Sequence, residues 1–454
     1  MNIVVMKFGG TSVGSAESIR DVAHIVDLRK DFKRIVVVSA LAGVTNSLFE
    51  IAGSAKDHDL SHAEQVLAAL EKRHADTATK LGIEAPQVMA AIHEILENVH
   101  KLARGVDLLG ELSPRTMDEI ASAGERMSSI LVSAFLRCPL LDARTVMKTD
   151  SHFGSARPKM PAIRKAVPLQ LAPLLESSDI VVTQGYIGSD DAGDTTTLGR
   201  GGSDFSAGLL GAAVQASEIE IWTDVEGILT ADPRIVPSAS TVEVLSYDEA
   251  AELASYGAKV LHPATVRPAL DAGIPVTIRS TFRPDGKHST ISPGQSSGRP
   301  CVAIAMRRNV AIVSITQEAM TEQAGFLARL FDVFGRKGIS VDLVSTSEIS
   351  VSVSLDASIP LDVLSQDLAK LGTVSIVKDR AVIAVVGDLL RKTPEVLKTS
   401  FDAIDHIPVD LISMGANAVN LSFIVQEQDA ERVVRNLHSA FFEKSGRTEP
   451  AGGV

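Results

Sequence analysis

Short apolar runs alternate with amphipathic stretches through roughly the first 295 residues of the chain. The runs are nearly unbroken and rich in Val and Ile, which is typical of strands covered on both faces. Between them, residues 16–30 place apolar side chains at helical spacing. This alternation predicts a mostly parallel central sheet with helices on both faces. The predicted strands are 3–6, 34–39, 180–183, 219–222 and 275–278.

Two longer stretches have helical composition without an intervening strand. Residues 61–107 are rich in Ala, Leu, Glu and His and predict a helical insertion. Residues 116–137 predict a further helix with Gly124-Glu125-Arg126 at its middle, and residues 205–214 a helix that follows a glycine-rich loop.

Beyond a turn-rich stretch at 283–300, the chain repeats itself. Residues 339–345 are echoed by 407–413, which places Asp342 and Asp410 in matching positions. Predicted strands at 310–315 and 381–386 open the two copies. In each copy a helical run precedes the repeated segment and an alternating strand follows it, as in a βαββαβ ferredoxin-like unit. We expect one α/β domain and two such modules, although duplicated small domains can also be mere dimerisation scaffolds. The predicted domains are 1–295, 305–378 and 379–446.

Composition narrows the class of protein. The chain has 45% hydrophobic and 22% charged residues, as expected of a soluble globular protein. A net charge of -12 argues against a nucleic-acid partner, and one Trp and three Tyr offer little stacking surface. We see no signal peptide, no membrane-spanning stretch, and neither disulfide nor metal-site spacing of the two cysteines. A cytoplasmic protein without a dedicated metal site is predicted.

The first chemical motif is Lys7-Phe8-Gly9-Gly10-Thr11-Ser12, directly after an apolar run. Glycines at the end of a strand let backbone amides approach an anion, and the lysine adds a positive charge. A phosphate site is one interpretation, and a strand-to-helix turn with a surface lysine is the other. The spacing of a Walker A loop is absent.

A second motif combines three glycines with an arginine and an aspartate. It runs from Gly199 to Asp204 and leads into a predicted helix, which favours an anion or carboxylate cradle over a simple flexible loop. After the second strand, Ser39 and Thr45 offer hydroxyls for a small polar substrate, or alternatively cap the next helix.

Two weaker segments add charge at strand ends. Thr223-Asp224 ends a strand and is followed by Asp232-Pro233-Arg234, which offers groups for a ribose or for phosphates. Lys259 precedes His262-Pro263, where the histidine is better explained as a cap or packing residue than as a general base. Together these cations and backbone amides suit phosphoryl transfer, which depends on positioning and charge neutralisation.

With these motifs in hand, the chain resembles aspartate kinase, a member of the amino-acid kinase family with tandem ACT domains. It is most similar to the monofunctional, lysine-sensitive type. The resemblance spans nearly the whole chain and implies transfer of a phosphoryl group from ATP to L-aspartate with Mg²⁺, giving 4-phospho-L-aspartate for lysine, threonine and methionine synthesis. Two alternatives remain: a catalytically silent amino-acid sensor, and a kinase for another acceptor such as acetylglutamate or a nucleoside monophosphate.

The resemblance also implies roles for individual residues. Lys7 and Asp204 would be catalytic, with Lys7 on the transferring group and Asp204 orienting it. Arg200 would hold the substrate α-carboxylate and Glu125 its α-ammonium. The remaining substrate-binding residues would be Ser39, Thr45, Gly201, Gly202 and Ser203, and the nucleotide-binding residues Lys7, Phe8, Gly9, Gly10, Thr223, Asp224, Leu229, Arg234, Lys259 and Val260. Relatives often have an aromatic residue at the position of Leu229, near the adenine.

In the second half, the resemblance implies an effector site for lysine, with threonine as a second candidate, and a homodimer or tetramer formed through the ACT domains. Asp342 and Glu348 are acids that an effector's ammonium groups require, although Asp342 is also explained as a strand-end turn residue, like Asp410. The implied effector residues are Met320, Gly325, Phe326, Leu327, Ser340, Val341, Asp342, Thr346, Ser347 and Glu348.

Overall fold

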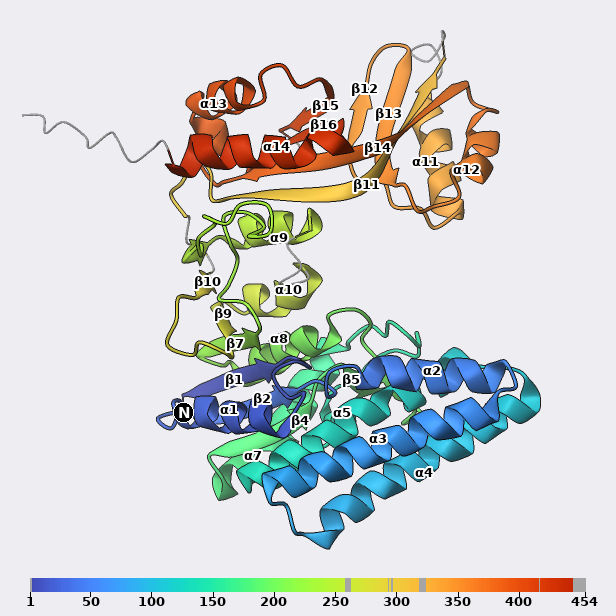
Figure 1. The fold of residues 1–454 in the computed structure, drawn as a ribbon, viewed down its shortest axis with the longest axis vertical. Helices are drawn as coiled ribbons and strands as arrows, with labels where there is room; N and C mark the ends of the chain where they lie inside the picture. The colour runs from blue at the N-terminus through green and yellow to red at the C-terminus, as the bar shows by residue number, and fades with distance from the viewer. Residues whose placement is uncertain are drawn as a thin grey trace, which may run out of the picture. The chain divides into compact units, whose positions relative to one another are not determined.

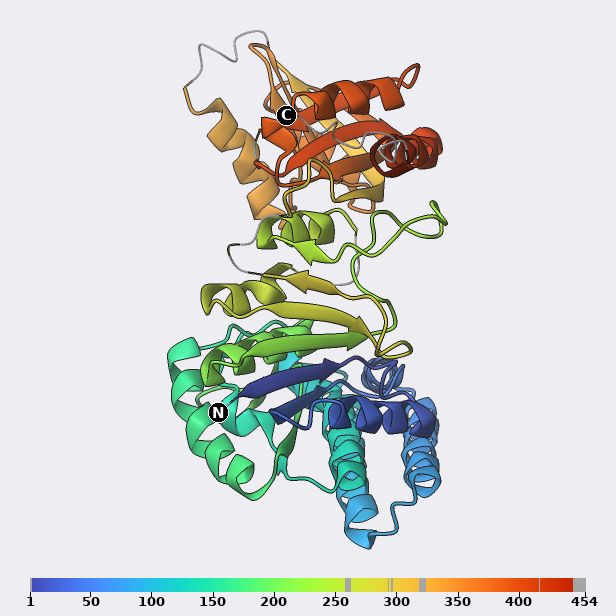
Figure 2. The same ribbon diagram turned by 90° about the vertical axis from the view of Figure 1, so that its left-hand side faces the viewer.

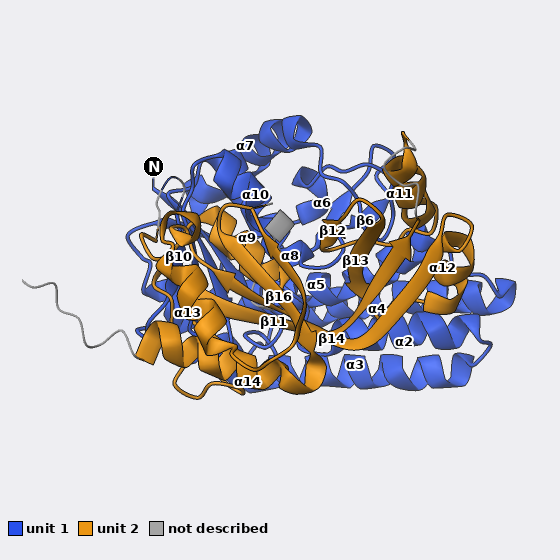
Figure 3. Cartoon of the chain, turned by 90° about the horizontal axis from the view of Figure 1, so that it is seen from above, with its two compact units in different colours: residues 1–228, 260–294 blue, residues 229–259, 295–454 orange. Residues whose placement is uncertain are grey.

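The computed structural model describes residues 2–257, 263–292, 294, 297–317, 324–415 and 417–443. The chain divides into two compact units, the first formed by 1–228 with 260–294 and the second by 229–259 with 295–454 (Figure 3). Within the described ranges, no helix is both long enough and apolar enough to cross a membrane.

The first unit is built on a twisted sheet whose strands lie in the order β3-β4-β2-β1-β7-β9-β10 (Figure 2). All neighbouring pairs are parallel except β9 with β10. The predicted mostly parallel sheet is thereby confirmed. Its strands are β1 (Ile3–Phe8), β2 (Lys33–Val38), β3 (Leu140–Leu141), β4 (Ile180–Gln184), β7 (Glu218–Thr223), β9 (Val276–Ser280) and β10 (Ser289–Ile291).

Helices cover both faces of this sheet, which explains the unbroken apolar character of its central strands. Val4, Met6 and Phe8 of β1 share a buried cluster with α1 (Ala16–Asp27), whose first turn is capped by Ser15. On the opposite face, α8 (Gly202–Val214) contacts β1, β2 and β7, and α7 (Met160–Ser177) contacts β4. Alternation along β1 therefore directs Lys7 toward α8.

The predicted helical insertion is present, and it is divided by chain-reversing turns. Figure 1 shows α2 (Val44–Lys56), α3 (Leu60–Leu81), α4 (Pro86–Leu109) and α5 (Pro114–Leu136) lying alongside one another. Gly82 and Gly110 end α3 and α4 with φ of 72° and 65°, a conformation that glycine adopts without strain. The four helices enclose their own apolar core.

Several short elements of the first unit gave no clear sequence pattern. The hairpin β5 (Ile187–Ser189) and β6 (Thr195–Thr197) leads into the glycine-rich loop, and α6 (Ala143–Val146) and α10 (Pro263–Asp271) complete the unit. Strands of two or three residues are too short for a periodicity argument.

The second unit contains a six-stranded antiparallel sheet in the order β12-β13-β11-β14-β16-β15. Its helices fill the predicted positions between the strands. The strands are β11 (Ala303–Thr316), β12 (Val344–Thr346), β13 (Ser350–Asp356), β14 (Thr373–Val386), β15 (Val409–Met414) and β16 (Asn420–Gln426). The helices are α11 (Phe326–Arg336), α12 (Leu361–Leu368), η1 (Leu390–Lys392), α13 (Glu395–Ala403), α14 (Glu427–His438) and η2 (Ser439–Glu443).

Two of these strands are longer than predicted, because each serves both modules. We expected strands at 310–315 and 381–386, whereas β11 and β14 each have 14 residues. Residues 303–307 pair with the C-terminal end of β14, next to β16, and residues 310–316 pair with its N-terminal end. A register shift between Arg307 and Val310 separates the two halves. The domain boundaries given above stay a prediction.

Residues 229–259 carry β8 (Val244–Leu245) and α9 (Tyr247–Ser255) and belong to the second unit. The Ile304 backbone N–H donates to Thr230 O at 2.8 Å. Glu249 Oε1 accepts from the Asp388 backbone N–H at 2.9 Å. These contacts attach a segment that follows β7 in the chain to the antiparallel sheet.

Candidate active site

An open cavity of about 590 Å³ lies where β1, β2 and the glycine-rich loop end. In open α/β sheets this carboxyl edge is where ligands bind. Nearly all its lining residues are polar or small. Among them are Lys7, Gly10, Ser39, Thr45, Glu125, Gly154, Tyr186, Arg200, Gly201, Gly202, Ser203 and Asp204.

Lys7 and Asp204 form an ion pair at the floor of this cavity. Lys7 Nζ lies 2.6 Å from Asp204 Oδ1, and the two side chains are 11% and 14% exposed. Lys7 comes from the end of β1 and Asp204 from the first turn of α8, where the helix dipole favours a negative group. The pair therefore presents a fixed ammonium group to the cavity.

The two glycines after Lys7 allow close packing of the neighbouring segments. A Cβ on Gly10 would lie 2.9 Å from Ala40 O, so only glycine fits there. The Gly9 N–H donates to Trp222 O at 3.3 Å. This amide is therefore engaged by the neighbouring strand. A backbone contact of Gly10 with a phosphoryl group stays a prediction.

Arg200 projects from the glycine-rich loop. Gly199 and Gly201 have φ of 74° and 72°, which explains why glycine flanks the arginine. Arg200 is exposed and makes no hydrogen bond or ion pair with any residue in the described parts of the chain. Its guanidinium is therefore available to a carboxylate ligand.

Glu125 is the buried acid of the cavity. It is 4% exposed, and its Oε2 has no hydrogen-bond partner among the described residues. Burial raises the pKa of this carboxyl to about 8, although the Ala40 amide favours the charged form. A cationic group bound against Glu125 would restore its charge.

Hydroxyls occupy the wall between these charged groups. Ser39 Oγ donates to Ser203 Oγ at 3.0 Å, and Ser128 Oγ donates to the Ser39 carbonyl oxygen at 2.7 Å. Thr45 lies in the first turn of α2 and lines the cavity. All substrate residues expected from the sequence thus line one cavity: Ser39, Thr45, Glu125, Arg200, Gly201, Gly202 and Ser203.

The expected nucleotide residues are less uniform. Thr223 and Asp224 lie at the end of β7, beside β1, where Thr223 Oγ1 donates to Asp224 Oδ1 at 3.1 Å. The Phe8 ring faces the core, because it is fully buried and stacks on Trp222 with 6.1 Å between ring centroids. A nucleotide contact through the Phe8 backbone stays a prediction.

Two more expected nucleotide residues belong to the second unit. Leu229 is half-buried, and exposed Arg234 pairs with Asp232 at 2.6 Å. Lys259 and Val260 lie outside the described residues.

The expected effector residues divide between core and surface. Gly325 caps α11 with φ of 83° and Phe326 is buried in the core, whereas Leu327 is 44% exposed. Thr346, Ser347 and Glu348 are exposed and Val341 is half-buried. Ser340 and Asp342 line a second cavity of about 520 Å³. Met320 lies outside the described residues.

Asp342 has a partner within the protein. It forms an ion pair with Arg307, and its repeat equivalent Asp410 pairs with Arg380 at 2.6 Å. Both arginines stand where β11 and β14 cross from one half of the sheet to the other. The shared pair supports a structural role for these acids and adds Arg307 to the groups around the second cavity.

Sequence reasoning missed Asp118 and Tyr186. Asp118 is buried on α5, seven residues before Glu125, and that spacing could have placed it on the same helix face. Tyr186 lines the cavity, and a Cβ on Gly202 would lie 2.7 Å from its Cδ2. Neither residue belongs to a motif that predicts chemistry.

The comparisons with known proteins agree with this fold and site. The model of the amino acid kinase family matches residues 2–280, and that of the ACT domain matches 313–359 and 383–441. The chain therefore belongs to the amino acid kinase family. It is 39% identical to lysine-sensitive aspartokinase 3 of Escherichia coli, over 97% of this chain and 99% of that one. It is 36% identical to chloroplastic aspartokinase 2 of Arabidopsis thaliana, over 97% and 84%.

Solved structures give the same result. Escherichia coli aspartokinase III in complex with aspartate and ADP (R-state) matches with a TM-score of 0.84 and 38% identity, over 97% of this chain and all of that one. The same enzyme with lysine and aspartate (T-state) matches with a TM-score of 0.82 and 37% identity, over 97% and 99%. Within its family the chain is an aspartokinase, and thus an enzyme. The comparisons give no support to a catalytically silent sensor.

Proposed function

We propose that the cavity around Lys7 binds L-aspartate and transfers the γ-phosphoryl group of ATP to its side-chain carboxylate. The supporting observation is that Glu125 Oε2 and the Arg200 guanidinium, which have no partner among the described residues, belong to side chains that line the same cavity. An α-amino acid carries the complementary pair, an ammonium and a carboxylate. Arg200 would grip the carboxylate through two parallel hydrogen bonds.

With both α-groups held, the substrate β-carboxylate is directed to the Lys7–Asp204 pair. The β-carboxylate oxygen attacks the γ-phosphorus, a new O–P bond forms, and the bond to the β,γ-bridging oxygen breaks to release ADP. Lys7 neutralises negative charge that spreads over the transferring group. Asp204 holds the Lys7 ammonium in place, so that no reorganisation is needed during transfer.

A divalent metal accompanies ATP in kinases, and we propose Mg²⁺. Among the described residues, no group of three or more His, Cys, Asp or Glu side chains is suited to hold a metal ion. Mg²⁺ bound mainly through nucleotide phosphates and water fits its preference for oxygen ligands.

The unpaired Glu125 Oε2 also argues against the other acceptors. Acetylglutamate has no free ammonium group, so its binding would leave this buried acid unpaired. L-Aspartate is the acceptor that uses both charged groups.

Regulation by lysine is proposed for the second unit, with a dimer or tetramer formed through its ACT domains. The E. coli relative was solved with lysine and aspartate together, and its structure matches 97% of this chain. The second cavity is lined by Ser340 and Asp342, and a lysine ammonium bound there would share the Asp342 carboxylate with Arg307. Inhibition then follows if lysine binds one state of the enzyme more tightly than the other.

The test uses the full chain with ATP, Mg²⁺ and L-aspartate. Hydroxylamine converts the acyl phosphate product into a hydroxamate that can be measured by its colour. We expect hydroxamate with L-aspartate, and little with succinate, which lacks the ammonium, or with acetylglutamate. Absence of hydroxamate with L-aspartate would refute the proposal. Titration with lysine, threonine and both tests the regulatory part.

The two free cysteines agree with a cytoplasmic location, which stays a prediction.

A further inference from the structure

The buried Asp118 carboxylate joins two segments of the cavity wall to helix α5. Asp118 is buried, with only 3% of its surface exposed. It accepts from the Gly154 N–H at 2.9 and 3.1 Å, from the Thr197 N–H at 2.8 Å and from Thr197 Oγ1 at 2.8 Å. Charge-assisted bonds of this kind are stronger than neutral ones. One carboxylate therefore anchors both segments.

Both anchored segments are neighbours of the loop that carries Arg200, one in the chain and the other in space. Thr197 is the last residue of β6 and stands three positions before the arginine. Gly154 lines the cavity, and a Cβ on Gly199 would lie 3.3 Å from Gly154 O. The loop that carries Arg200 thus rests on the segment that Asp118 holds. Movement of either anchor would move the guanidinium.

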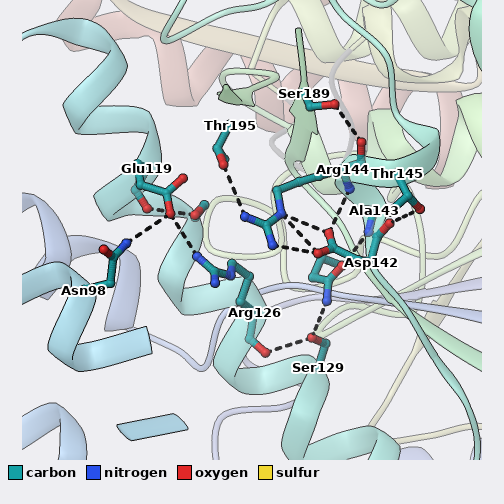
Figure 4. A network of polar contacts seen from close by, with 12 residues as sticks. Asn98, Glu119, Arg126, Ser129, Asp142, Ala143, Arg144, Thr145, Ser189 and Thr195 are labelled. Atoms are coloured by element: carbon teal, nitrogen blue, oxygen red, sulfur yellow. Dashed lines mark hydrogen bonds and ion pairs between the residues drawn. The ribbon is translucent and has the colours of Figure 1, made fainter. Parts of the chain in front are cut away.

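Helix α5 carries the other substrate group. Asp118 and Glu125 are seven residues, or two turns, apart and share one helix face, about 10 Å apart along the axis. The neighbouring face of α5 is fixed separately. Figure 4 shows Glu119, which contacts Arg126 and Asn98, in a network that also includes the Asp142–Arg144 pair. Helix α5 therefore carries both Glu125 and Asp118, the residue that anchors the Arg200 loop.

We propose that Asp118 is a positioning residue that sets the distance between Arg200 and Glu125, and so the fit of the α-carboxylate and α-ammonium of the amino-acid substrate. The inference rests on the proposed function of this cavity. It concerns a residue that makes no contact with substrate, and it predicts an effect on aspartate recognition rather than on nucleotide binding.

The main test is Asp118→Asn, since asparagine keeps the shape but turns one acceptor oxygen into a donor that faces N–H and O–H groups. We expect the KM for L-aspartate to rise at least tenfold, with the KM for ATP within about twofold of wild type. Asp191→Asn is the matched control, because among the described residues this exposed acid pairs only with Lys159, at the surface between β5 and β6, and it should leave the KM for L-aspartate within about twofold. An equal rise in both KM values for Asp118→Asn would overturn the inference.

A double-mutant cycle separates positioning from general structural damage. If Asp118 acts through Arg200, Asp118→Asn should add less than about threefold to the aspartate KM of Arg200→Ala, because the group it positions is gone. Full additivity would contradict the proposal. Should Asp118→Asn fail to fold, Thr197→Val removes only the Oγ1 donor and carries the same cycle.

Failure of the proposed function would be recognised separately. If the wild-type chain does not phosphorylate aspartate, the cycle is measured with aspartate dissociation constants from calorimetry. Hydrogen exchange of the Gly154 and Thr197 amides gives a further readout, because Asp118→Asn should speed exchange at both. Unchanged exchange would show that Asp118 is not the anchor.

Discussion

Lys7 Nζ lies 2.6 Å from Asp204 Oδ1, and this contact joins the end of the central strand β1 to the first turn of α8. A lysine held in this way needs no rearrangement before it meets a phosphoryl group. The aspartate also limits the freedom of the ammonium when the cavity is empty. The pair is thus a fixed electrostatic feature of the fold.

Replacing the lysine should abolish most turnover. We expect Lys7→Ala to lower kcat by about 10²–10³-fold, the usual effect of removing one group that stabilises transition-state charge. Hydroxamate formation measures the rate, and circular dichroism tests whether the fold persists. Asp204→Asn should lower kcat less, because the lysine remains but loses its partner. A Lys7→Ala enzyme with near-normal kcat would remove the role assigned to this residue.

The raised pKa of Glu125 predicts a pH-dependent stability. Burial places this pKa at about 8, above its ordinary value of 4.5, so between these pH values the folded chain binds more protons at this site than the unfolded chain. The stabilising contribution is therefore full below pH 4.5 and is lost as the pH rises toward 8. Thermal unfolding of wild type and Glu125→Gln between pH 5 and 9 measures it.

We expect the wild type to lose stability relative to Glu125→Gln as the pH increases. The glutamine cannot titrate, so the variant is the matched control. A difference in melting temperature that is constant across this range would contradict the raised pKa.

The same carboxyl predicts proton release when substrate binds. An ammonium group favours the charged form of Glu125, so near pH 7 aspartate binding should release up to one proton from this residue. Calorimetry in buffers of different ionisation enthalpy counts the protons. The KM for L-aspartate should also fall as the pH rises from 6 to 8, while the KM for ATP changes less. Binding without proton release would argue that the ammonium lies elsewhere.

Gly124 offers a steric test of the cavity wall. A Cβ at this position would lie 2.8 Å from the Ala40 Cβ, so α5 lies against the loop after β2 more closely than any larger residue permits. Gly124→Ala should destabilise the protein by about 1–3 kcal/mol and raise the KM for L-aspartate, since both Glu125 and Ser39 would shift. Gly105→Ala is the control, because a Cβ there meets nothing within 4 Å. Equal effects of the two variants would contradict this explanation.

The repeated acids of the second unit allow a matched test of lysine inhibition. Asp342→Asn and Asp410→Asn each break an equivalent pair with arginine, but only Asp342 lines the second cavity. We expect Asp342→Asn to raise the lysine concentration for half inhibition at least tenfold, with uninhibited activity retained, and Asp410→Asn to leave it near wild type. Inhibition curves at fixed aspartate and ATP provide the measurement. Equal changes in both variants would indicate a purely structural role.

The central sheet was predictable from sequence because its strands are buried on both faces. The runs around Val4, Val36 and Val182 contain almost no polar residue, and such runs have few alternative structures. The cavity was predictable because glycines next to Lys7 or Arg200 let backbone amides approach an anion beside a cationic side chain. Each of these signals is local in the chain.

Other features depend on contacts between distant residues. Asp118 carries no motif, and its importance arises only when Gly154 and Thr197 come to it in the folded chain. Phe8 stands inside a phosphate-site motif, yet alternation along β1 directs its ring into the core against Trp222. The length of β11 was missed because the exposed residues around Arg308 interrupt its apolar pattern at the point where it crosses between modules.

The continuous strands β11 and β14 have a consequence for dissecting this protein. Residues 303–307 complete the sheet that contains β16, although the other module separates them in the chain. A fragment that starts after residue 378 would lack the strand that pairs with residues 382–386 of β14, and would leave the backbone of β14 unpaired along that side. The second repeat therefore cannot be expressed as a complete autonomous fold. Gene fusions, truncations and domain exchanges should therefore keep residues 303–443 together.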